Sequence, residues 1–64
     1  MSDLEFLEVQ LRDNLMLQHS IRLFAMTNLS KDNPFKPLIE AQTCRSVNEI
    51  REVLDQLEET KSGT

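Results

Sequence analysis

The feature that most constrains this chain is a long first run without proline or glycine. Pro34 is the first proline and Gly63 is the only glycine. Within this run, apolar residues recur at spacings of three and four, which is the period of an amphipathic helix. One row of that helix consists of Leu4, Leu7, Leu11, Leu15, Met26 and Leu29. The run therefore predicts one long helix over about residues 3–29.

The start of this helix carries a capping signal. Ser2 and Glu5 have the Ser-x-x-Glu spacing of a capping box, directly before the apolar run. In such a box the serine oxygen accepts a hydrogen bond from a first-turn amide, and the glutamate reaches back to the cap amide. We therefore expect the helix to begin at Asp3.

The same helix carries more apolar surface than one neighbour can cover. A second row is formed by Phe6, Leu17 and Phe24, and a third, at intervals of seven residues, by Val9, Met16 and Leu23. A neighbouring helix hides only about a 100° stripe. We therefore expect the hairpin to meet a second copy of the chain or another protein in a helical bundle. Gln18 and Arg22 lie close to the first row and are candidates for fixing its register.

Both prolines fall in the stretch that follows. Proline disfavours helical geometry in the residue before it, so Pro34 and Pro37 predict a corner over residues 30–36. In this corner we expect Phe35 to fold back onto the hairpin as a buried plug. A helical segment should follow over about residues 37–60, with a frayed polar tail at 61–64.

This second helical segment could consist of two short helices or of one continuous helix. Ser46 and Glu49 have the spacing of another capping box, which favours a short helix ending near Cys44 and a new one starting at Ser46. We favour these two pieces. A single helix from Pro37 to about Glu59 stays open, because residues 43–45 contain no strong helix breaker.

The tripeptide Asn33-Pro34-Phe35 resembles the short peptide ligand of EH domains, the helical adaptor modules of endocytic trafficking. The resemblance covers three residues of 64. It implies an exposed Phe35 that is offered to a partner, whereas a structural corner implies a buried one. We favour the corner.

Composition restricts the class of protein. Eleven acidic and seven basic side chains give a net charge of −4, which disfavours binding to nucleic acid and to anionic membranes. The single cysteine excludes an internal disulfide, and with the absence of a cationic, apolar leader it fits a cytoplasmic protein. No apolar run is long enough for a membrane span. Phosphate-binding loops lack the glycines that they need.

No set of residues predicts a catalytic, cofactor or metal site. His19 is the only histidine and has no carboxylate three or four residues away, and Cys44 has only Arg45 beside it. The last helical segment carries five acidic residues, which we expect to form a solvent-exposed face: Glu49, Glu52, Asp55, Glu58 and Glu59. We therefore expect a protein that is not an enzyme.

Together these features predict an all-α helical hairpin that acts as a small protein–protein interaction module, such as an adaptor, assembly factor, inhibitor or complex subunit. Its expected interface consists of Leu17, Ile21, Leu23 and Phe24, in a helix-in-groove or bundle mode, with a protein partner or with itself. The alternative is a nucleic-acid-binding regulator that works as a helical oligomer. That function requires four basic residues to converge on one face: Arg12, Arg22, Arg45 and Arg51.

Overall fold

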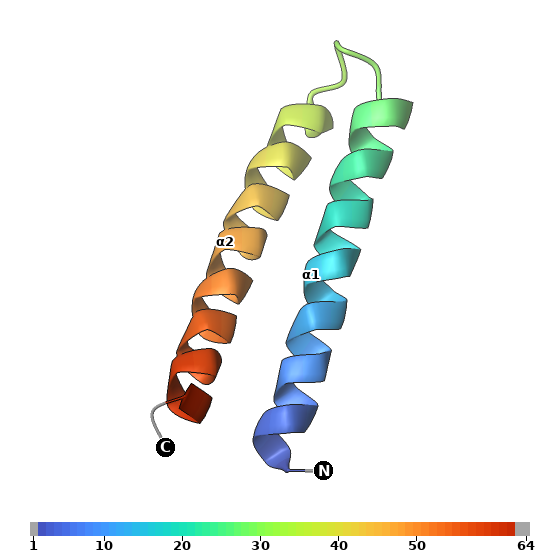
Figure 1. Cartoon of the computed structure of the whole chain (residues 1–64). Helices are drawn as coiled ribbons and strands as arrows, with labels where there is room; N and C mark the ends of the chain where they lie inside the picture. Colours follow the sequence, from blue (N-terminus) through green and yellow to red (C-terminus); the bar gives the residue numbers. More distant parts are fainter. Residues whose placement is uncertain (1, 63–64) are drawn as a thin grey trace.

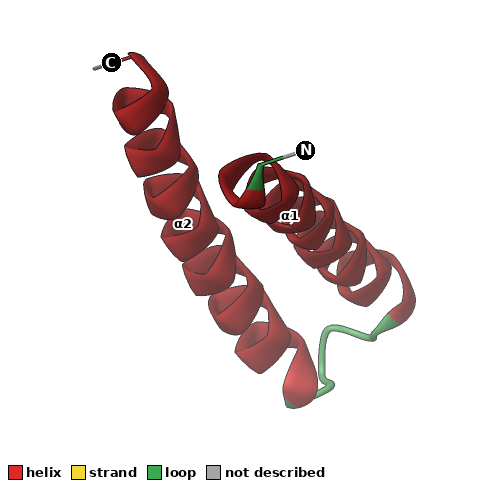
Figure 2. Cartoon of the chain, turned by 90° about the horizontal axis from the view of Figure 1, so that it is seen from below, coloured by secondary structure: helices red, strands yellow, loops and turns green. Residues whose placement is uncertain are grey.

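The computed structural model describes residues 2–62 and has the form of an antiparallel helical hairpin. Helix α1 spans Asp3–Asn28 and helix α2 spans Phe35–Ser62. The two helices lie side by side, and both chain ends lie at the end opposite the connecting corner (Figure 1). Figure 2 shows the same pair from below, with no other element beside either helix in the described chain. The all-α hairpin predicted from the sequence is confirmed.

The hairpin is a rod with a single layer of contact. It measures 50 × 18 × 12 Å along its principal axes, and its radius of gyration is 14.9 Å. A compact chain of this length would have a radius of gyration of about 11 Å. Each helix is therefore packed along one side and open to solvent on the others.

Side chains form hydrogen bonds to the backbone near both ends of α1. The Glu5 amide donates to Ser2 Oγ at 3.2 Å, which confirms the serine half of the predicted capping box. At the other end, the Thr27 hydroxyl donates to the Leu23 carbonyl at 2.8 Å, and Asn28 Nδ2 donates to the Phe24 carbonyl at 3.0 Å. Both carbonyls also accept from backbone amides one turn later, as helix geometry requires. The last bond of the helix runs from the Leu29 amide to the Ala25 carbonyl at 3.1 Å, so α1 ends at Asn28.

The corner is shorter than predicted, because Asn33 starts the second helix early. The Asn33 amide donates to the Ser30 carbonyl at 3.1 Å and closes a turn. Asn33 Oδ1 then accepts from the Phe35 amide at 2.9 Å, as a helix N-cap does. Pro34 follows the cap, at the position where a missing amide costs least. Helix α2 therefore begins at Phe35 and not at Pro37, which lies in its first turn.

Phe35 is 64% exposed, so the prediction of a buried plug is wrong. The reason is its position on the capped helix. Lys36 is half-buried and lies in the heptad row of Thr43 and Ile50 that faces α1. The residue before Lys36 is rotated about 100° away from that row, so Phe35 points outward.

The prediction of a break near Cys44 is also wrong, because α2 is continuous. Ser46 is a half-buried residue in the middle of the helix and not a cap. The Thr43 hydroxyl donates to the Ile39 carbonyl at 2.8 Å, so it is satisfied without leaving the helix. Lys61 and Ser62 are helical rather than frayed, and residues 63–64 of the predicted tail lie outside the described residues.

The two helices meet along one seam. Its buried members are Ala25, Thr43, Val47, Ile50 and Leu57, and half-buried members include Leu11, Leu15, Gln18, Leu29 and Leu54. On each helix these positions follow spacings of three and four, as in an antiparallel coiled coil. Ala25 and Thr43 are the two least exposed residues described, at 2% and 3%. Both side chains are small, and almost none of their surface is left exposed.

We predict that Ala25→Leu destabilises the hairpin by about 1–3 kcal/mol, because the seam has no room for three further carbon atoms. The matched control is Ala41→Leu, which makes the same change at an exposed position of α2. Urea unfolding followed by circular dichroism measures both variants. An equal loss of stability in the two variants would contradict close packing at Ala25.

Candidate interaction surface

Most of the apolar surface of this hairpin is left exposed on α1. Among residues 2–62, thirteen large apolar side chains are exposed, and ten of them belong to α1. These ten are Leu4, Phe6, Leu7, Val9, Met16, Leu17, Ile21, Leu23, Phe24 and Met26. Of the three rows on α1, helix α2 covers only part of the first: Leu11, Leu15 and Leu29 are half-buried, whereas the other three members of that row stay exposed.

The four predicted interface residues are all exposed, but they do not share one face. Leu17, Ile21 and Phe24 are 57%, 40% and 65% exposed, and their spacings of four and three place them on one stripe of α1. Leu23 is 63% exposed and lies about 100° from Phe24. It belongs to a second stripe with Met16 and Val9, at intervals of seven residues.

The stripe of Leu17, Ile21 and Phe24 belongs to a larger surface without charge. On α1 it continues at spacings of three and four through Leu7, Gln10, Asn14, Leu17, Ile21, Phe24 and Asn28. The equivalent flank of α2 consists of Ile39, Ser46, Val53 and Thr60. Equivalent flanks of two antiparallel helices lie on the same side of the pair. We call these eleven residues the uncharged face.

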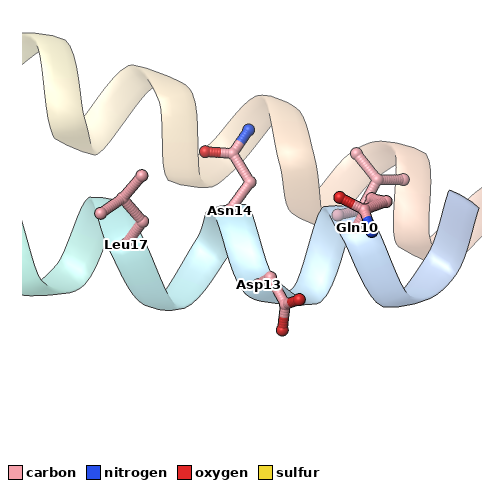
Figure 3. A pocket seen from close by; sticks show the side chains of 5 residues that line it. Gln10, Asp13, Asn14 and Leu17 are labelled. Atoms are coloured by element: carbon pink, nitrogen blue, oxygen red, sulfur yellow. The ribbon is translucent and has the colours of Figure 1, made fainter.

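The absence of charge on this face is unusual for this chain, in which 28% of residues are charged. A shallow hollow at the border of the face is lined by Gln10, Leu11, Asn14 and Leu17 and by one charged residue, Asp13. Figure 3 shows Gln10, Asn14 and Leu17 on the side of α1 that borders α2, while the Asp13 side chain points away from them. Asn14 Oδ1 accepts from Gln18 Nε2 at 3.3 Å. Reasoning from the sequence missed the uncharged face, although the charge-free spacing on α1 is visible there.

A cluster of charges ties the open ends of the two helices together. Arg12 Nη2 lies 2.9 Å from Glu8 Oε1, and Lys61 Nζ contacts the other carboxylate oxygen of Glu8. The hydrogen bond from Lys61, and then that from Arg12, lowers the pKa of Glu8 below its ordinary value of 4.5. Glu8 is half-buried at the edge of the seam, so its carboxylate joins the end of α2 to the second turn of α1.

The lowered pKa predicts how acid affects stability. A carboxyl group whose pKa falls on folding stabilises the fold above its ordinary pKa, and this contribution is lost as the pH drops through the folded value. Below pH 4.5 the unfolding free energy of the wild type should therefore fall more steeply than that of Glu8→Gln. Lys61→Met should flatten the same curve, because it removes the main partner. Urea unfolding at a series of pH values tests this, and identical slopes in wild type and Glu8→Gln would contradict it.

The other candidate residues are placed apart. His19 is exposed and borders a second shallow hollow with Arg22, Leu23 and Met26, and Cys44 is an exposed free thiol on α2. Within residues 2–62, no three His, Cys, Asp or Glu side chains are grouped so that they could hold a metal ion. The five acidic residues near the end of α2 are exposed.

The four arginines are not gathered on one face of a single hairpin. Arg12 is bound to Glu8. Arg22 lies ten residues further along α1, which is about 15 Å away. Arg45 and Arg51 are six residues apart on α2, so they point about 120° away from each other.

Comparison with known proteins identifies no relative. No family model matches this chain, and neither a curated protein nor a solved structure is similar enough to match it. In the described part of the chain, neither helix contains a stretch long and apolar enough to cross a membrane.

Proposed function

We propose that this chain is a small non-enzymatic interaction module that associates with other protein chains through the exposed apolar surface of α1. The proposal rests on the exposed surface of α1. This helix exposes ten large apolar side chains, and in the described structure only Ala25 of this helix is buried. A helix that is apolar on most sides is ordinarily covered on most sides.

The chemistry of the surface supports this role. Contiguous apolar surface mixed with uncharged polar groups is typical of the centre of a protein interface, where charged residues are depleted. Leu17, Ile21 and Phe24 have the spacing with which a helix places anchors in a partner's groove. A cytoplasmic setting is part of the proposal, since the exposed free thiol of Cys44 suits a reducing compartment.

Two charge-introducing variants test the proposal. Leu17→Glu combined with Phe24→Glu should weaken association at least about tenfold, because two carboxylates would have to be buried in the interface. The matched control, Leu38→Glu with Gln56→Glu, adds the same charge to exposed positions of α2. Co-purification of a tagged copy with untagged copies and with proteins of the source cell measures association, and circular dichroism checks the helices. A wild-type chain that associates with neither would overturn the proposal.

A second candidate function is favoured by the exposure of Phe35. The capped turn presents its ring to solvent directly after Asn33 and Pro34, in the order of the peptide ligand of EH domains. In this role the corner would be bound by an adaptor domain, independently of the surface on α1.

This candidate predicts that Phe35→Ala abolishes binding to an EH domain while the unfolding free energy changes by no more than about 0.5 kcal/mol, as for an exposed side chain. Phe6→Ala is the control, since Phe6 is similarly exposed at the opposite end of α1. Isothermal titration calorimetry with a purified EH domain gives the affinity. Equal binding by wild type and Phe35→Ala would exclude this function.

A further inference from the structure

We infer that the uncharged face is covered by a second copy of this chain, packed antiparallel so that α1 lies against α1 of the partner and two hairpins form a four-helix bundle. This inference rests on the proposed function and names its partner. It follows from three features of the hairpin: the position of the uncharged face, the symmetry of its side chains and the distribution of charge along the molecule.

The position of the uncharged face suits a four-helix bundle. Its α1 stripe lies about a quarter of a turn from the seam with α2, and in such a bundle each helix contacts two neighbours at about this angle. The α2 stripe of Ile39 and Val53 borders the same side of the seam. None of the eleven residues of the face is charged, and Asp13 lies at its border, so burying these residues avoids the largest cost of desolvation.

The side chains of the α1 stripe have a symmetric order. Ile21 stands at the centre, with Leu17 and Phe24 on either side and Asn14 and Asn28 seven residues away in each direction. A two-fold axis through Ile21 therefore places Leu17 against Phe24 of the partner subunit and Asn14 against Asn28 of the partner subunit. Apolar groups then meet apolar groups, and amides meet amides. A two-fold interface requires such self-complementarity, whereas a different partner does not.

The charges favour the antiparallel orientation. Residues 18–48, which form the corner half, carry four basic and two acidic side chains, for a net charge of +2. The remaining residues carry three basic and nine acidic side chains, for a net charge of −6. An antiparallel pair brings the corner half of one copy beside the acidic half of the other. A parallel pair would place the two acidic halves side by side, where their repulsion acts over roughly 8–10 Å.

Cysteine cross-linking tests the position of the axis. In a Cys44→Ser background, Ile21→Cys should form a disulfide-linked dimer in a glutathione redox buffer, because this position meets its own copy at the axis. Ser20→Cys, on the outer side of the same turn, should cross-link less by about tenfold or more, because a disulfide needs Cα atoms within about 7 Å. Equal cross-linking of the two variants would overturn the inference.

The orientation has its own test. A mixture of Leu17→Cys and Phe24→Cys copies should give mainly mixed dimers if the pair is antiparallel. Predominant linking of Leu17→Cys to itself would show a parallel pair and would overturn the antiparallel arrangement.

Sedimentation equilibrium separates this inference from the proposed function. The wild-type chain should be a dimer, and Leu17→Glu with Phe24→Glu should be a helical monomer. A wild-type chain that stays monomeric at all concentrations overturns the second copy as partner. If this monomer still binds a different protein through Leu17 and Phe24, the proposed function stands alone, and if it binds none, both fall.

Discussion

The structure depends on a single seam between two long helices. A neighbouring helix covers only about a 100° stripe, and each helix of a hairpin has only one neighbour. Ala25 and Thr43 are almost completely buried in that seam, but a single seam cannot also cover the other apolar rows of α1. The exposed surface is thus a consequence of the number of helices and not of loose packing. Any arrangement of the 64 residues as two antiparallel helices would leave it uncovered.

The two helices use that seam differently. Helix α2 places its buried residues on one side and most of its charged residues on the other, which is the pattern of a helix at the outside of a bundle. Helix α1 has apolar residues on both flanks of its seam and carries no acidic residue between Asp13 and Asp32. It therefore has the composition of a helix at the centre of an assembly. In the proposed dimer, α1 packs against both α2 and α1 of the partner subunit, while the charged side of α2 stays in water.

Much of this fold could be predicted from local sequence signals, and the errors occurred where two signals compete. Ser2 caps α1 as expected, because its backbone is extended and its hydroxyl oxygen accepts from the Glu5 amide. Ser46 has the same local pattern but does not cap, because Thr43, Val47 and Ile50 continue one buried row across it. Phe35 was misplaced because Asn33 caps the helix and fixes which side of the first turn faces α1. The α1 stripe of the uncharged face is visible in the sequence, but the whole face also needs the pairing of the two flanks, which the sequence does not give.

The small size of the seam links stability to association. In the described residues the buried core consists of four apolar side chains and Thr43, which is little for a chain that must order about sixty residues. Covering the uncharged face would bury further apolar area from Leu17, Ile21 and Phe24. Folding and assembly would then draw on the same apolar surface, so the stability of the hairpin would rise with its concentration. The exposed rows of α1 would then form a second part of the hydrophobic core, together with the same surface of a partner chain.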